Sequence, residues 1–227
     1  MSGIDYLSLV ISPVVAIALV LYMNYRFQVK SNKHMINAII FGLISVVLVL
    51  AAQILAESFG LDSLRSLKRT AFYSFVIIGF SSELGKFVFL RYYFLPKENF
   101  TGPLDGIIYS ILIGLGFATT ACILLGFEVI GARVNNLYLF LFGAANIVFA
   151  IIMGFFVGLG KSRQNRFIDS MTGLFAATFL HGLYAFSFAT RDNRLLILFA
   201  IGSIVIVILL SAKAIKIKEN DKYNMKE

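Results

Sequence analysis

A few polar side chains lie deep inside otherwise apolar stretches of this sequence, where ionisable groups are expensive and usually functional. Glu83 and Lys86 share one such stretch, and Asn146 and His181 lie in two others. A carboxylate and an imidazole at one buried point could bind a metal ion, or could act as a general base with its partner. A hydrolytic zinc usually needs three protein ligands, so these two groups are only part of such a site.

Each of these side chains also has a structural explanation. Glu83 and Lys86 are three residues apart, so they share a helix face and could neutralise each other. His181 could donate a helix–helix hydrogen bond. Asp105 follows a proline at a helix start, where an acid suits the positive end of the helix dipole. Glu128 lies close enough to a membrane interface to be hydrated.

The composition identifies a membrane protein. Of 227 residues, 59% are apolar and only 14% are charged, and the mean hydropathy is +0.87. Soluble domains are about 45–50% apolar and about 25% charged, so a soluble enzyme, a secreted disulfide scaffold and a disordered chain are excluded. The single cysteine, Cys122, allows no internal disulfide. The net charge of +8 does not indicate nucleic acid, because most basic residues flank apolar stretches.

Seven apolar stretches are long enough to cross a bilayer, which takes about 20 residues in a helix. They lie near 6–26, 36–57, 70–94, 104–128, 136–160, 168–190 and 194–217. The sequence therefore predicts an all-α bundle of seven spans in one domain, 1–217, followed by a charged tail, 218–227. The segment 58–69 is expected to form either an interfacial amphipathic helix or a polar loop.

The basic residues predict the orientation of the spans. The odd-numbered connections and the C-terminal tail carry thirteen Lys and Arg residues, and the opposite side carries six. Since cytoplasmic loops are enriched in Lys and Arg, we expect the N-terminus outside and the C-terminus in the cytoplasm. The tail lysines are expected to lie against anionic lipid.

The polar residues within the spans have similar depths. Glu83, Asn146 and His181 lie 11, 14 and 13 residues from the cytoplasmic ends of their spans, which places them within roughly 5 Å of one height. Small residues at every fourth position place His181 on a face that allows close helix contact. We therefore expect Glu83, Lys86, Asn146 and His181 to converge on one polar pocket among spans three to six.

Five short segments resemble motifs of the PrsW family of intramembrane proteases, which is related to the CAAX-processing glutamate proteases. Ser82–Lys86 is similar to the EExxK motif of that family, and Asp105–Tyr109 followed by Gly114–Ala118 is similar to its DGxxYG…GxGFAxxEN segment. Met153–Gly158 and His181–Tyr184 resemble two later motifs. The resemblance covers about half the chain, and it implies a PrsW-like bundle in a bacterial inner membrane.

The departures from the family pattern fall on its polar residues. Ser82 stands where the family has its first Glu, Ala121 and Cys122 stand for its Glu-Asn pair, and Asn146 stands for a His. The family positions that survive are Glu83, Lys86 and His181. Cys122 could replace a lost donor, but one residue along a helix is a rotation of about 100°, so Cys122 should not face where Ala121 faces.

Two functions follow from this pattern. The favoured one is a non-catalytic relative that binds a transmembrane segment or partner subunit in the inherited cleft, with Ser82, Lys86, Asn146 and Cys122 as supporting residues. The alternative is an active intramembrane peptidase, in which Glu83 and His181 are catalytic and could hold zinc. A transporter with a proton relay is a more distant third. Membrane lipids and a membrane segment are the expected partners, nucleic acid is not, and the oligomeric state stays open.

Overall fold

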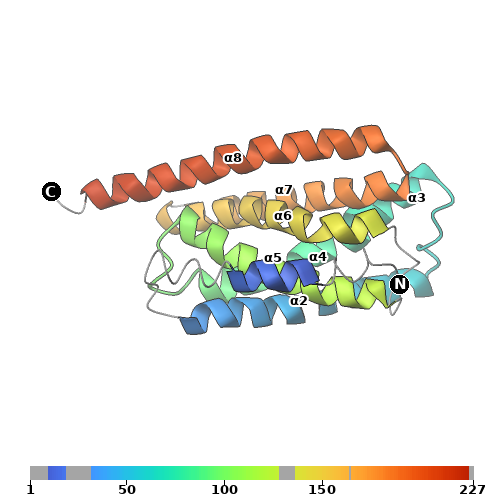
Figure 1. Ribbon diagram of the computed structural model, residues 1–227, viewed down its shortest axis with the longest axis horizontal. Helices are drawn as coiled ribbons and strands as arrows, with labels where there is room; N and C mark the ends of the chain where they lie inside the picture. Colours follow the sequence, from blue (N-terminus) through green and yellow to red (C-terminus); the bar gives the residue numbers. More distant parts are fainter. Residues whose placement is uncertain (1–9, 19–31, 128–135, 164, 225–227) are drawn as a thin grey trace.

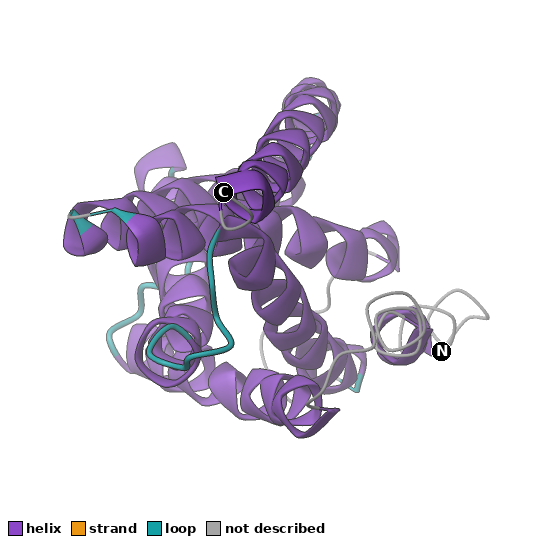
Figure 2. Cartoon of the chain, turned by 90° about the vertical axis from the view of Figure 1, so that its left-hand side faces the viewer, coloured by secondary structure: helices purple, strands orange, loops and turns teal. Residues whose placement is uncertain are grey.

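The computed structural model describes residues 10–18, 32–127, 136–163 and 165–224, and it confirms an all-α membrane bundle. Long helices run along one another in Figure 1, and Figure 2 shows no strand in the described residues. Six helices there are long and apolar enough to cross a membrane. Most of the first predicted span, 6–26, and Glu128 lie outside the described residues. The part of that span at 10–18 is helical.

The helices agree with the predicted spans to within a few residues, except at the C-terminus. They are α2 (Asn32–Ser58), the consecutive segments α3 (Leu67–Phe72), η1 (Tyr73–Phe80), α4 (Ser81–Phe89) and η2 (Leu90–Phe94), then α5 (Pro103–Gly126), α6 (Asn136–Ser162), α7 (Arg166–Ala189) and α8 (Asn193–Asn224). α8 continues seven residues past the predicted end of the last span, because charged residues end an apolar stretch without ending a helix.

The segment after α2 is a loop for most of its length. Gly60 adopts φ 63°, and residues 61–66 are not helical before α3 begins at Leu67. Ser66 caps α3 by accepting a hydrogen bond from the Arg69 backbone N–H at 3.3 Å. Of the two expectations for 58–69, the structure therefore has the polar loop.

The third span is a continuous helix with two π-helical parts, η1 and η2, on either side of α4. π-Helical turns are wider than α-helical ones and are frequent at functional sites. η1 packs closely on α7: a Cβ on Gly79 would lie 2.9 Å from the Gly182 nitrogen and the Thr178 carbonyl oxygen. This contact brings the α4 residues that follow Gly79 beside His181, the residue before Gly182.

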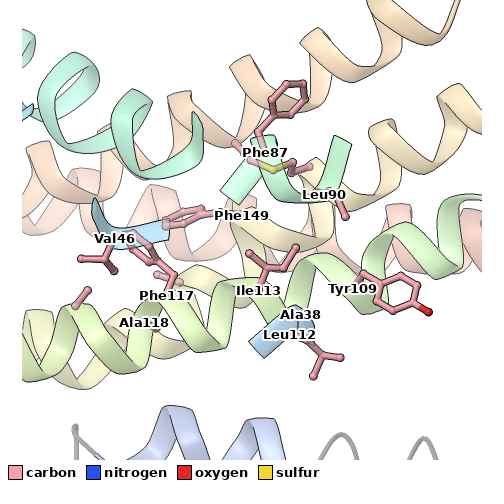
Figure 3. Close-up of a cluster of buried hydrophobic side chains, with 14 of the residues drawn as sticks. Ala38, Val46, Phe87, Leu90, Tyr109, Leu112, Ile113, Phe117, Ala118 and Phe149 are labelled. Atoms are coloured by element: carbon pink, nitrogen blue, oxygen red, sulfur yellow. The ribbon is translucent and has the colours of Figure 1, made fainter. Parts of the chain in front are cut away.

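α5 and α6 form the centre of the bundle. In an apolar 18-residue stretch of each helix, 67% of the residues are buried, whereas in the corresponding stretch of α8 only 11% are buried. The two helices touch backbone to backbone, since a Cβ on Gly158 would lie 2.6 Å from the Gly102 oxygen, and one on Gly154 would collide with the Gly106 oxygen. Figure 3 shows the apolar cluster around them, including Phe117 of α5 and Phe149 of α6. α8 lies on the periphery and exposes isoleucines and leucines along its length.

Charged residues organise the end of the bundle where α5 begins. Asp105 Oδ2 accepts hydrogen bonds from the backbone N–H of Thr101 at 2.7 Å and from its hydroxyl at 2.6 Å. Lys218 donates to the same hydroxyl at 2.7 Å and lies 3.5 Å from Asp105 Oδ2. Lys161 donates to the carbonyl oxygens of Leu95 and Lys97 at 3.0 and 3.1 Å. Asp105 is thus part of the helix start, and Lys218, the first residue of the predicted charged tail, lies within α8.

The backbone contact between α5 and α6 predicts the effect of one added methyl group. Gly154→Ala should lower the free energy of unfolding by about 1–3 kcal/mol, because an overpacked interface must shift its backbone. Gly202→Ala on α8 is the matched control, since nothing lies within 4 Å of its added Cβ, and it should leave stability unchanged or slightly raised. Thermal unfolding in detergent checks both variants. Equal melting temperatures for the two would contradict the close packing.

Candidate functional site

Four buried polar side chains meet between α4, α6 and α7. Glu83 Oε1 accepts a hydrogen bond from Lys86 Nζ at 2.6 Å and lies 2.7 Å from His181 Nδ1. Lys86 Nζ also donates to Asn146 Oδ1 at 2.9 Å. The four side chains predicted to converge therefore do lie together, and none of the four residues is more than 2% exposed.

The local structure of each helix aims these groups at one another. Glu83 and Lys86 are three residues apart on α4, so they share its face. Asn146 on α6 donates from Nδ2 to the Phe142 carbonyl oxygen of its own helix at 2.9 Å, which leaves its Oδ1 for Lys86. Asn146 therefore binds the Lys86 ammonium through its amide oxygen. It does not provide the imidazole that a histidine at this position would provide.

Aromatic rings enclose the polar cluster. The Phe149 ring stacks on the His181 ring with centroids 4.6 Å apart and an interplanar angle of 16°. The Lys86 ammonium lies 4.7 Å from the centroid of Phe117 and 5.7 Å from that of Phe149. Such rings attract a cation electrostatically and exclude water. The ammonium is thus held by two oxygens and two ring faces.

Two atoms of the cluster have no hydrogen-bond partner among the described residues, namely Glu83 Oε2 and His181 Nε2. A buried polar atom without a partner costs about 1–3 kcal/mol, so such atoms usually serve a bound molecule or water. If His181 donates from Nδ1 to Glu83, its Nε2 is a free lone pair. Unpaired acceptors at this position can receive a hydrogen bond from a ligand or take a proton.

A cavity of about 1160 Å³ extends from this cluster to one end of the bundle. His181 and Ser82 line it, together with apolar residues that include Val46, Val49, Ile78, Phe142 and Ala185. Its other polar lining residues include Gln53, Glu57, Asp62, Arg191 and Asn193. The cavity therefore joins an apolar interior with a charged mouth, and His181 is the link between the cavity and the buried cluster.

Cys122 does not belong to this site in the described structure. Ala121 lines the cavity, whereas Cys122 is not among its lining residues, and its nearest polar contact is the Leu139 carbonyl oxygen, 4.0 Å from Sγ. The rotation of one residue along α5 accounts for the difference. Cys122 packs as a small buried apolar side chain.

The residues present do not fit a catalytic zinc. Among the described residues, no group of three His, Cys, Asp or Glu side chains lies close enough to hold a metal ion. Two oxygens that could face a metal, Glu83 Oε1 and Asn146 Oδ1, already accept from the Lys86 ammonium. A second cation beside that ammonium would be repelled.

Sequence reasoning did not identify the aromatic walls or the charged mouth. Phe117 and Phe149 are two of 23 phenylalanines, and their spacing gives no sign that they contact a charge. Glu57, Asp62 and Arg191 stand at helix ends, where charged residues ordinarily face water. The signal that could have found Phe149 is its position three residues after Asn146, on the same helix face.

Comparison with known proteins agrees with the motif resemblance. A family described as PrsW family intramembrane metalloprotease matches residues 30–212. A protein named Protease PrsW from Geobacillus kaustophilus is 26% identical over 188 residues, which are 81% of this chain and 79% of the relative. A protein of the same name from Bacillus subtilis is 25% identical over 187 residues, which are 81% of this chain and 82% of the relative. One from Halalkalibacterium halodurans is 25% identical over 193 residues, 78% of this chain and 80% of the relative. No solved structure matches.

The buried ion pair predicts a non-additive effect on stability. Lys86→Met leaves the Glu83 carboxylate buried without its cation and should cost about 3–5 kcal/mol. Adding Glu83→Gln should recover much of that loss, with a coupling of about 0.5–3 kcal/mol in a double-mutant cycle. Unfolding in detergent measures the cycle. Lys216→Met, at an exposed position of α8, is the control and should unfold like the parent. Strict additivity would show that the pair does not act as a unit.

Proposed function

The chain belongs to the PrsW family of intramembrane metalloproteases, and we propose that this member binds a membrane-anchored polypeptide segment in its cavity without metal-dependent hydrolysis. The observation that carries the proposal is the Lys86 ammonium, bound by Glu83 Oε1 at 2.6 Å and by Asn146 Oδ1 at 2.9 Å. Those two oxygens stand at the family's acidic motif and at its fifth-span histidine position. Lys86 belongs to the family motif, so the feature that sets this member apart is Asn146, whose amide oxygen binds the ammonium where the family has a histidine.

Ligand chemistry supports the non-catalytic part of the proposal. A catalytic zinc keeps three protein ligands and one open position. Glu83 and His181 could supply two, and the amide of Asn146 is a poor ligand for zinc. The position of the family's second-motif Glu holds Ala121, which brings no donor. Hydrolysis by a metal would need residues that the described cluster does not contain.

The cavity supports the binding part. Its volume of about 1160 Å³ exceeds the roughly 300–1,000 Å³ typical of small-molecule sites. Its apolar walls suit the side chains of a membrane segment. His181 and Ser82 line its inner end, and His181 Nε2 has no partner among the described residues, so these two side chains suit an exposed peptide backbone. A polypeptide therefore satisfies both the apolar and the polar parts of this cavity.

The free Nε2 of His181 favours a second candidate, a metal-independent peptidase. Glu83 would orient His181 through Nδ1, and Nε2 would take a proton from a water as the water oxygen attacks a peptide carbonyl carbon. The same proton would then pass to the leaving amide nitrogen as the C–N bond breaks. This candidate ranks second because the Lys86 ammonium is bound to Glu83 and Asn146 and does not line the cavity, so it cannot stabilise the oxyanion there.

The cavity opens at the end of the bundle that the basic residues predict to be outside. Its mouth is formed by the segment after α2 and by the α7–α8 connection, and these carry fewer Lys and Arg than the opposite end. In this orientation the C-terminus is cytoplasmic, and a bound segment reaches the cavity from the outer leaflet of a bacterial inner membrane.

Binding without cleavage can be tested with a synthetic peptide of about twenty leucines and alanines, flanked by lysines, in liposomes. A photo-crosslinking residue at Phe142 in the cavity should capture the peptide, and the same residue at Ile204 on the exposed face of α8 should not. The peptide should remain intact with and without a chelator.

Three results would count against this assignment. Failure to cross-link at Phe142 would remove the binding role. Cleavage that a chelator, Glu83→Gln and His181→Ala each abolish would show a metalloprotease. Cleavage that resists the chelator but needs His181 would select the second candidate.

The orientation predicts which end of the bundle is accessible to a membrane-impermeant thiol reagent. In a Cys122→Ala background, Leu64→Cys in the loop after α2 should be labelled on intact cells. Asn220→Cys near the end of α8 should be labelled only after permeabilisation. Both positions are exposed, so the difference reports sidedness. The reverse pattern would invert the topology.

A further inference from the structure

One side of the cavity mouth carries hydrogen-bond acceptors from the end of α2 and the loop that follows. Glu57 and Asp62 contribute carboxylates, and Gln53 contributes an amide. The Gln53 Oε1 atom is buried and has no partner among the described residues. Three neighbouring acceptor groups on one wall suit a donor-rich cationic side chain, because an ammonium brings three N–H groups and a guanidinium brings five.

The two carboxylates are not neutralised within the described part of the chain. The ion pairs found there join Lys86, Arg163, His181 and Lys218 to other acids. Arg69, in the same region, donates to the Ser63 hydroxyl at 2.8 Å. Glu57 and Asp62 therefore present their charge to whatever enters the mouth.

The opposite side of the mouth carries the other sign of charge. Arg191 lies in the α7–α8 turn with φ 55°, a conformation that few residues other than glycine adopt. Its backbone N–H donates to the Phe188 carbonyl oxygen at 3.2 Å, and the next residue, Asp192, caps α8 through the Arg194 N–H at 2.9 Å. Arg191 lines the cavity together with the three acceptor residues. Among the residues that line the cavity, the acids thus come from the α2 side and the arginine from the α7–α8 turn.

The inner end of the cavity indicates what kind of molecule occupies it. His181 is fully buried, lines the cavity and leaves Nε2 without a partner. A lipid acyl chain would leave that atom unsatisfied, whereas a peptide backbone brings N–H groups that can donate to it. The occupant with apolar side chains and its own hydrogen-bonding groups is a polypeptide.

We propose that Gln53, Glu57 and Asp62 form a subsite for a Lys or Arg residue that directly follows the apolar part of the bound segment. This inference rests on the proposed function, because it assigns a sequence preference to the same cavity. A basic residue at this position sets the depth of the segment, since its charge stays at the mouth while the preceding apolar residues lie between α2, η1, α5 and α7. The Arg191 guanidinium repels a basic residue of the bound segment. The Lys or Arg of that segment is therefore favoured at the three acceptors and disfavoured beside the α7–α8 turn.

The test compares two peptides and three proteins. The peptides share about twenty leucines and alanines and differ only in flanking Lys or Gln residues. The proteins are the parent, Glu57→Gln/Asp62→Asn, and Glu98→Gln/Glu219→Gln, which removes two exposed acids at the opposite end of the bundle. Affinity is measured in nanodiscs of neutral lipid, and occupancy is followed by photo-crosslinking from Phe142.

The parent and the Glu98→Gln/Glu219→Gln control should bind the Lys peptide about three- to tenfold more tightly than the Gln peptide. The preference should shrink as salt rises, because both carboxylates are exposed to solvent. In Glu57→Gln/Asp62→Asn it should disappear, while cross-linking of the Gln peptide from Phe142 is retained.

Each alternative outcome overturns a different statement. Equal affinity of the parent for the two peptides, with cross-linking from Phe142 intact, would refute the subsite and leave the binding role in place. Absence of peptide cross-links from Phe142 would refute the binding role itself. Cross-links from Phe142 to lipid in place of peptide would show that the occupant is a lipid. A preference that survives in Glu57→Gln/Asp62→Asn would assign it to other residues.

Discussion

An ammonium and a carboxylate buried among helices each carry a desolvation penalty of several kcal/mol, and only close pairing with further hydrogen bonds offsets it. Lys86 and Glu83 meet that requirement with partners from two other helices: Asn146 on α6 and His181 on α7. The positions of α4, α6 and α7 relative to one another are therefore tied to four side chains. The close contact of Gly79 in η1 with α7 lets Glu83 and His181 approach within hydrogen-bond distance, since a methyl group at Gly79 would force the two helices apart.

The amide that Asn146 brings to this pair explains why the site differs chemically from a metal centre. The family's histidine position in the fifth span is an asparagine here, and an amide oxygen accepts a hydrogen bond from an ammonium but is a poor ligand for zinc. Because Glu83 Oε1 and Asn146 Oδ1 both accept hydrogen bonds from the Lys86 ammonium, neither oxygen is left to bind a second cation on that side of the cluster. On the other side, His181 Nε2 and Glu83 Oε2 are buried acceptors without a partner among the described residues. A site of this kind receives hydrogen bonds more readily than it activates a carbonyl group.

Much of this architecture could be predicted from the sequence, for a simple reason. A membrane helix rises by a fixed 1.5 Å per residue, so the depths of Glu83, Asn146 and His181 followed from counting. What surrounds them could not be counted. Phe149 stacks on His181, and Glu57 and Asp62 share one cavity with Arg191, because distant helix ends and faces meet only in the folded bundle. The π-helical parts of the third span and the continuation of α8 to Asn224 also have no signature in hydropathy.

The length of α8 has a consequence for the bilayer that surrounds the bundle. Its candidate span runs from Asn193 to Asn220 over 28 residues, or about 42 Å, whereas the hydrocarbon core of a bilayer is about 30 Å thick. Because Lys213, Lys216, Lys218 and Glu219 lie in its last turns, this helix extends past the hydrocarbon core at that end, and its tilt depends on membrane thickness. Lys218, near its far end, is bound to Thr101 and Asp105 at the start of α5. A change in membrane thickness that alters the tilt of α8 therefore pulls on the contacts of Lys218 with Thr101 and Asp105. Since α5 lines the cavity, membrane thickness is coupled to the cavity through these contacts.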